Sequence, residues 1–190
     1  MDPRIAKTHA AVMQAATDLL VEGGPEALTV DGVVARSGVA KSTVYRHWAT
    51  RDELVAAVFD NCAPDLDEPD PSLSGPQALR ELTRQLADNL GDPSWRRLLP
   101  ALLLLKIQHA PVADIEDDLA DRQQALAESL LRKCVDEGAL DPSVLDDLGA
   151  SVALLAGPLM LAALFETVAL DAVFADRVTD QFLRAHRPAT

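Results

Sequence analysis

Apolar residues recur at intervals of three or four along most of this chain, which is the spacing of helices that bury one face. The first such segment, residues 3–21, carries an apolar stripe and is stopped by Gly23, Gly24 and Pro25. Alternating β-branched segments bounded by hairpin turns, the usual sign of a sheet, do not occur. The pattern predicts an all-α protein of about nine helices.

The other predicted helices follow from the same stripes, together with caps and breakers. They are residues 30–37, 41–48, 51–62, 76–91, 94–110, 112–137, a long penultimate helix opened by Asp141 and Pro142, and 171–185. The run Leu98–Leu105 is apolar nearly all round and is expected to be buried, with a kink or restart at Pro100.

The stretch Gly38–Trp48 (GVAKSTVYRHW) joins two of these helices through a tight turn. Gly38 suits the positive φ of a helix-ending turn, and Val44 and Trp48 can pack inward. The outer side chains of the second helix can all hydrogen-bond to DNA bases or phosphates. In a helix-turn-helix the second helix enters the DNA major groove, so this stretch is interpreted as a DNA-recognition helix.

The region resembles the DNA-binding domain of the tetracycline-repressor (TetR) family of transcriptional regulators. The resemblance rests on Thr29 opening the second helix, the Gly38-Val39 turn, the Tyr45-x-His47-Trp48 ending of the third helix and Arg51 opening the fourth. It covers roughly residues 4–62. Beyond them, the all-helical plan and the Gly157-Pro158-Leu159 segment are similar to family members.

This resemblance implies an N-terminal helix-turn-helix domain and a C-terminal helical domain for ligand binding and dimerisation. An acidic segment rich in proline, Pro64–Gly75, is predicted as the loop that follows the domain boundary. The expected division is residues 1–50 for the DNA-binding domain, a linking helix over 51–62, and 63–190 for the C-terminal domain.

The candidate DNA contacts divide into base-reading and phosphate-binding groups. Lys41 can donate to guanine O6 or N7, and the methyl group of Thr43 can meet a thymine methyl. Tyr45 and His47 match family positions that bind phosphate, and basic side chains nearby add charge. The full set is Thr29, which can also cap its helix, with Lys41, Ser42, Thr43, Tyr45, Arg46, His47 and Arg51.

The net charge of −13 looks unsuited to nucleic acid until it is divided along the chain. Residues 1–51 hold six Lys or Arg against five Asp or Glu, a charge of +1, which leaves −14 for the remainder. Phosphate attraction is local, because salt screens charge beyond about 8 Å. The acidic remainder is expected to confine DNA contact to one face, and the low charge of the N-terminal part predicts weak non-specific binding.

Residues 148–165 carry no charged side chain and are just long enough to cross a membrane. Gly157-Pro158 interrupts the segment, and its flanks hold acidic residues without Lys or Arg, so a membrane span is rejected. The resemblance implies that this helix and the last one form a four-helix bundle in a homodimer that binds a palindromic operator.

A small-molecule pocket is also implied by the resemblance, with effector binding coupled to the spacing of the two DNA-binding domains. The ligand is expected to be small and largely apolar, and to release a repressor from DNA. The candidate lining concentrates apolar bulk on the helices expected around the pocket. It consists of Trp95, Leu99, Leu102, Leu103, Met160, Leu164 and Phe165, although plain core packing is the better explanation for each of them taken singly.

Other functions fit the residues less well. The four histidines are scattered, and no HExxH, GxSxG or P-loop pattern occurs, so neither an enzyme nor a cofactor is expected. Cys62 and Cys134 lack metal-like spacing, so no metal is expected. The charged first residues do not resemble a secretory signal, so a cytoplasmic location is expected. The remaining alternative is a helical interaction or ligand-binding protein that keeps the fold without sequence-specific DNA binding.

Overall fold

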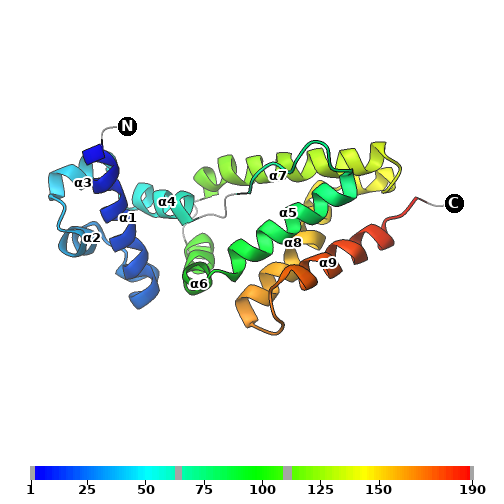
Figure 1. Cartoon of the computed structure of the whole chain (residues 1–190). Coiled ribbons are helices and arrows are strands. Elements are labelled where there is room, and N and C mark those ends of the chain that lie inside the picture. The colour runs from blue at the N-terminus through cyan, green and yellow to red at the C-terminus, as the bar shows by residue number, and fades with distance from the viewer. Residues whose placement is uncertain (1–2, 63–65, 109–112, 189–190) are drawn as a thin grey trace. The chain divides into compact units, whose positions relative to one another are not determined.

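The computed structural model describes residues 3–62, 66–108 and 113–188, and the regular elements within these ranges are all helical. The elements are α1 (Pro3–Gly23), η1 (Pro25–Ala27), α2 (Val30–Ser37), α3 (Lys41–His47), α4 (Arg51–Cys62), α5 (Gly75–Gly91), α6 (Pro93–Gln108), α7 (Ala113–Asp136), η3 (Pro142–Leu145), α8 (Leu148–Phe165) and α9 (Ala172–Ala185). The predicted all-α class is confirmed (Figure 1). The predicted ends near residues 109–112 lie outside the described ranges.

The chain forms two compact units. The first unit is Met1–Ala63 together with Arg97–Leu119, and the second is Pro64–Arg96 together with Ala120–Thr190. Residues 97–119 group with the first unit. The division into residues 1–50, 51–62 and 63–190 stays a prediction.

In the first unit, α1 packs against both α2 and α4, and α2 packs against α3 (Figure 1). The apolar stripe predicted for α1 is largely buried, because Val12, Ala16 and Leu20 are at most 1% exposed. The other helices contribute Val33, Val44 and Leu54, none of which is exposed at all. Each short helix therefore owes its stability to this shared core, since a helix of seven or eight residues is marginal alone.

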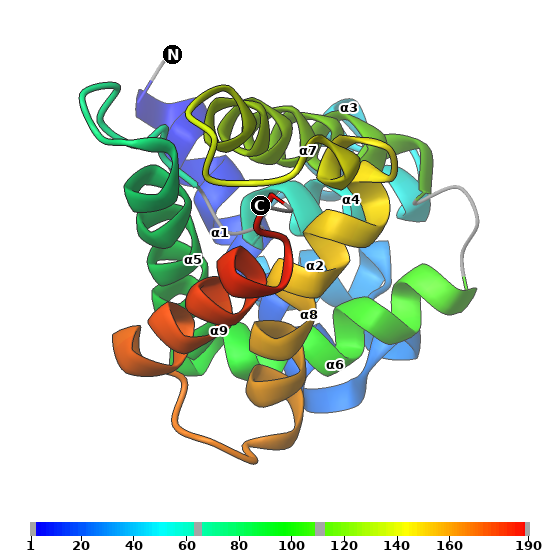
Figure 2. The same cartoon turned by 90° about the vertical axis from the view of Figure 1, so that its right-hand side faces the viewer.

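The second unit is built on α5, which packs against α9 and α8, while α8 and α9 also pack on each other (Figure 2). A buried hydroxyl pair fixes the contact of α5 with α9, because Thr83 Oγ1 and Thr179 Oγ1 lie 2.6 Å apart. Beside it, Arg84 donates two hydrogen bonds of 2.7 Å to Asp176. These hydrogen bonds hold the pKa of the Asp176 carboxyl below its usual value.

The penultimate helix departs from the prediction at its start. Residues 142–145 form the short η3, and α8 begins only at Leu148. Two aspartates act as separate N-caps, because the Asp141 side chain accepts from the Ser143 N–H and the Asp147 side chain accepts from the Ala150 N–H. An N-cap marks the start of a helix, so η3 and α8 are two separate helices. The prediction of one long helix opened by Asp141 was therefore wrong.

The apolar run of α6 is buried only in part. Leu98 and Leu99 are at most 3% exposed, but Leu104 is 42% exposed. Pro100 lies inside a helix that continues from Pro93 to Gln108, so the helix does not restart there. The expectation of burial along the whole run was therefore wrong at Leu104.

The core of the second unit includes one unusually close approach between helices. Gly75, at the start of α5, lies against the α7 backbone at Cys134, whose buried side chain belongs to the core. A Cβ atom at Gly75 would lie 2.8 Å from the Cys134 Sγ and N atoms. Burial, followed by the charge of Glu137, raises the pKa of the Cys134 thiol to about 12, so this thiol stays protonated and packs as a small apolar group.

Replacing Gly75 with alanine is expected to destabilise the protein by about 1–3 kcal/mol, because α5 and α7 would have to separate. The measurement is denaturant unfolding of the wild type, G75A and G91A. Gly91 ends the same helix, and a Cβ there would make only an ordinary 3.6 Å contact with the Leu170 carbonyl oxygen. Equal midpoints for G75A and the wild type would show that the close approach is not a constraint.

Candidate DNA-binding site

The turn between α2 and α3 has the backbone geometry that its sequence predicts. Thr29 is the N-cap of α2, where its hydroxyl accepts a 3.0 Å hydrogen bond from the Gly32 N–H. Gly38 ends α2 with φ of 68°, a left-handed conformation that L side chains rarely adopt. Its N–H donates to the Val34 carbonyl, and α3 begins three residues later. The two helices are therefore joined by the short glycine turn of a helix-turn-helix.

The seven-residue α3 separates its inner and outer faces as predicted. Val44 is completely buried and Trp48, just after the helix, is 6% exposed, so both anchor α3 to the core. Thr43 is half-buried, and the remaining polar side chains are exposed. The exposed set is Lys41, Ser42, Tyr45, Arg46 and His47.

An ion pair that the sequence did not reveal links α3 to α2. Lys41 Nζ lies 2.6 Å from Asp31 Oδ1, and the same ammonium group lies 5.7 Å from the centre of the Tyr45 ring. The hydrogen bond that Lys41 donates to Asp31, and next the negative charge of that carboxylate, raise the pKa of Lys41. Asp31 and Lys41 lie on opposite sides of the turn, so helical spacing alone could not pair them.

Arg51, predicted as a DNA contact, is bound within the first unit. Its Nε donates to the Leu28 carbonyl at 2.8 Å, and its Nη2 donates to the Pro25 carbonyl at 2.6 Å. These bonds tie the start of α4 to the segment that leads into α2. The side chain thus positions Thr29 and the N-terminus of α2.

Two further groups on this unit escaped the sequence reasoning. The centre of the His9 ring, in α1, lies 5.3 Å from the centre of the Trp48 ring. The centre of the His47 ring, in α3, lies 5.6 Å from the same point. Arg36, at the end of α2, donates to both carboxylate oxygens of Glu22 on α1 at 2.5 and 2.6 Å. The basic side chain of Arg36 is therefore partly neutralised by its own unit.

The candidate pocket residues fall in both compact units. Leu99 is buried and Leu103 half-buried in the first unit, and the Leu102 side chain lies outside the described part of the chain. In the second unit Trp95, Met160 and Leu164 are half-buried, whereas Phe165 is 67% exposed. The Trp95 Nε1 atom is buried and has no hydrogen-bond partner among the described residues.

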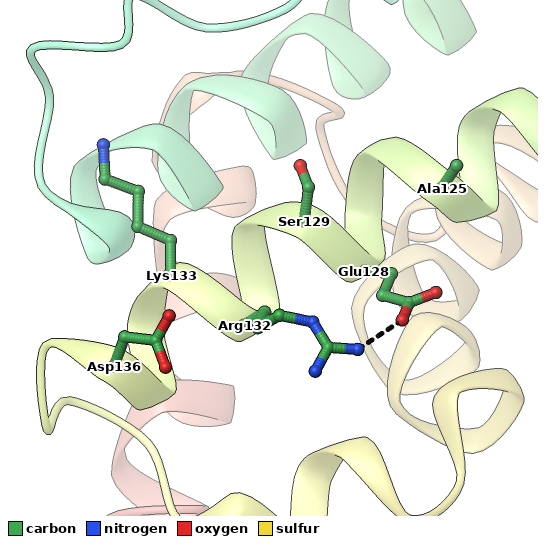
Figure 3. Close-up of a pocket in the computed structure, with 6 residues that line it drawn as sticks. All are labelled: Ala125, Glu128, Ser129, Arg132, Lys133 and Asp136. Atoms are coloured by element: carbon green, nitrogen blue, oxygen red, sulfur yellow. Dashed lines mark hydrogen bonds and ion pairs between the residues drawn. The ribbon is translucent and has the colours of Figure 1, made fainter.

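A separate open hollow lies along α7, and Figure 3 shows its side chains. Its cations are already engaged: Arg132 pairs with Glu128 at 2.6 Å, and Lys133 donates to the carbonyls of Pro71 and Leu73. Within the described ranges, no group of three or more acidic, histidine or cysteine side chains could hold a metal ion.

A glycine turn, a buried inner face and exposed polar groups on α3 together define a helix-turn-helix DNA-binding protein. Residues 12–58 match the family model described as bacterial regulatory proteins of the tetR family. Residues 74–182, more than half of the chain, match the tetracyclin repressor-like C-terminal domain. The chain belongs to the tetR family and is a DNA-binding transcriptional regulator, not an enzyme.

Relatives and solved structures agree with this assignment. The HTH-type transcriptional regulator YdeS of Bacillus subtilis is 27% identical over 96% of this chain and 87% of its own length. The HTH-type transcriptional repressor Rv3405c of Mycobacterium tuberculosis is 47% identical over 57 residues, 30% of each chain. The structure of MexZ from Pseudomonas aeruginosa superposes with a TM-score of 0.74 at 18% identity, covering 96% of both chains, which shows a shared fold.

Replacing Arg51 with methionine is expected to lower the stability of the first unit by about 1–3 kcal/mol, because two carbonyl acceptors lose a charged donor. Thermal unfolding without DNA gives the stability, and hydrogen exchange at residues 28–33 shows whether the start of α2 loosens. R46M, which alters an exposed side chain of α3, is the control. Unchanged exchange in R51M would show that Arg51 does not hold this segment.

Proposed function

We propose that this regulator is a homodimeric repressor that binds a palindromic operator and is released by a small, largely apolar molecule. Members of the tetR family are usually dimers that respond to small molecules. The observation that carries the proposal is the exposed polar face of α3, held by the buried Val44 and Trp48. This face presents side chains able to contact both base edges and phosphates.

In the proposed complex the side chains of α3 have different tasks. Lys41, Ser42 and Thr43, in its first turn, read base edges, because the N-terminal part of a recognition helix reaches deepest into the groove. Tyr45, His47 and Arg46 bind phosphate. Thr29 offers the N-terminus of α2 to a phosphate, and Arg51 contributes by fixing that N-terminus and by its charge.

The proposed dimer surface is the uncovered apolar side of α8. This helix has a mean hydropathy of 2.1 over its 18 residues and is long and apolar enough to cross a membrane. Only 28% of those residues are buried within one chain. Leu154 and Leu161 are each 55% exposed and lie two turns apart on one side. A second copy of the same surface would cover both, as a four-helix bundle with α9 requires.

Gly157 supports this interface. It lies between Leu154 and Leu161, and a Cβ atom there would meet nothing within 4 Å in the same chain. Glycine inside a helix costs about 1 kcal/mol relative to alanine, so its presence needs a reason outside the chain. Close approach of the partner helix supplies that reason. Phe165, also exposed, belongs to this surface in our proposal rather than to the effector pocket.

For the effector, the remaining candidates within one unit are Trp95, Met160 and Leu164 of the second unit. The unpartnered Trp95 N–H supports a ligand that is mostly apolar and carries one hydrogen-bond acceptor. Release follows if the ligand-bound dimer holds its two recognition helices away from the roughly 34–36 Å spacing of one DNA turn. A repressor of this kind acts in the cytoplasm, where bacterial DNA lies.

Selection of duplexes from a random library at two salt concentrations tests the operator. A palindrome is expected, with affinity that falls as salt rises. The double variant Y45F/H47Q should bind every duplex about tenfold more weakly, because each DNA-binding domain of the dimer loses phosphate contacts. Lys41→Met or Thr43→Ala should instead select a different motif. An unchanged affinity of Y45F/H47Q would contradict the phosphate contacts of Tyr45 and His47. An unchanged motif for Lys41→Met and Thr43→Ala would contradict the base contacts of Lys41 and Thr43.

Sedimentation velocity tests the dimer. L161D is expected to be monomeric at concentrations where the wild type is a dimer, because a carboxylate would be buried between two apolar helices. L104D places the same charge on an exposed leucine of α6 and should remain dimeric. G157A should unfold no more easily than the wild type yet dimerise more weakly. A dimeric L161D would place the interface elsewhere.

A further inference from the structure

Two histidine side chains flank the ring of Trp48 at the end of the recognition helix. The ring of His9, on α1, and the ring of His47, the last residue of α3, both contact this indole. Both histidines are exposed, whereas Trp48 is buried. We propose that His9 is a further phosphate contact of this regulator and that, together with His47, it makes DNA binding stronger at low pH. The inference rests on the proposed phosphate contact of His47.

Trp48 holds the two imidazoles at one edge of the unit. Its N–H donates a 2.8 Å hydrogen bond to the Val44 carbonyl, and its side chain is anchored in the core. The rings of His9 and His47 meet the indole at interplanar angles of 47° and 50°, a tilted arrangement that aromatic pairs favour. Because both rings rest on the same fixed indole, a DNA strand whose phosphate reaches His47 also passes close to His9.

Neither imidazole has a polar partner within the chain. Neither ring forms a hydrogen bond or an ion pair with any residue that the structure describes. If position 9 served only to cover Trp48, an apolar side chain would do so without nitrogen atoms that need a partner. Exposed imidazole nitrogen atoms bond to water in the free protein. They can exchange that water for a phosphate oxygen when a duplex lies against this edge.

Histidine is the side chain whose charge changes in the neutral pH range. The helices around Trp48 carry other charged groups, among them Lys7 of α1, Glu26 of η1, Arg36 of α2, which is paired with Glu22, Arg46 of α3 and Glu53 of α4. Glu53 lies beside the chain at Trp48, because its carboxylate accepts a 2.8 Å hydrogen bond from the Ala49 N–H. Carboxylates ordinarily titrate near about pH 4, and lysine and arginine above about pH 10. A change of affinity between pH 8 and pH 6 that depends on His9 therefore reports its imidazole.

The sign of the pH effect follows from the charge of the phosphate. A phosphate favours the protonated imidazole, because the two charges are opposite and the protonated ring has two N–H donors. The complex therefore binds more protons than the free protein and the free duplex together. Linkage then requires the affinity to rise as the pH falls. The gain levels off once the free histidines are also charged, below about pH 6.5 for an ordinary imidazole.

The test measures affinity at pH 8 and pH 6 for the duplex that the wild type enriches from a random library. If phosphate favours each charged imidazole about two- to threefold, the four rings of a dimer give the wild type a gain of about thirtyfold at pH 6. H9Q should gain only about fivefold, and H9Q/H47Q less than about twofold. H186Q removes a histidine of the second unit, whose ring contacts Phe182, and should keep the full gain.

A fixed charge at position 9 tests the phosphate contact without a change of pH. H9K should bind the duplex about fivefold more tightly than the wild type at pH 8, and the gain that remains on going to pH 6 should match that of H9Q. Q14K is the matched control, because it adds the same charge to an exposed position of α1 roughly 140° around the helix from His9. It should raise the affinity at pH 8 less than about twofold.

Three results would overturn this role of His9 while DNA binding itself stands. They are a wild-type affinity that does not change with pH, an H9Q variant that gains as much as the wild type, and equal gains by H9K and Q14K. Circular dichroism checks that each variant folds, and H9K decides the question if H9Q does not fold. A wild type that binds no duplex at either pH would contradict the proposed DNA contacts themselves, and this inference with them.

Discussion

The left-handed turn at Gly38 is the constraint on which the DNA-binding surface depends. It lets α2 and α3 meet after three intervening residues, and L side chains rarely adopt its φ of 68°. With only seven residues, α3 cannot persist through its own hydrogen bonds. The turn brings Val44 and Trp48 into the core, and their burial stabilises the helix. The outer face then stays free to carry polar side chains.

In the same unit, ion pairs within the chain neutralise part of the positive charge. Its basic groups are few, and Arg36 and Lys41 each pair with a carboxylate of a neighbouring helix. A protein with a net charge of −13 therefore presents DNA with a surface whose attraction is both local and restrained. Such restraint favours binding that depends on well-placed contacts over binding by charge alone.

In the second unit, apolar surface and close packing set the constraints. Gly75 lets α5 approach the α7 backbone at Cys134, and the hydroxyl pair of Thr83 and Thr179 fixes α5 beside α9. These contacts leave the Leu154 and Leu161 side of α8 uncovered. An apolar helix that is buried on one side only needs a partner for the other side, which links the architecture of one chain to the proposed dimer.

Local features could be predicted because a few adjacent residues decide them. The Thr29 cap, the Gly38 turn and the inward Val44 and Trp48 each follow from residue type and spacing. The break before α8 is also encoded, in the capping side chains of Asp141 and Asp147, but an acidic residue beside an apolar run does not by itself identify a helix cap.

The sequence by itself determined the helices, the recognition motif and the family, since these depend on short-range periodicity and backbone preference. The tertiary structure decided which side chains meet across those helices. It gave Lys41 a carboxylate partner, turned Arg51 toward two carbonyl groups, and left Phe165 exposed. Contacts between residues far apart in the chain depend on how helices pack, and no local pattern records that packing.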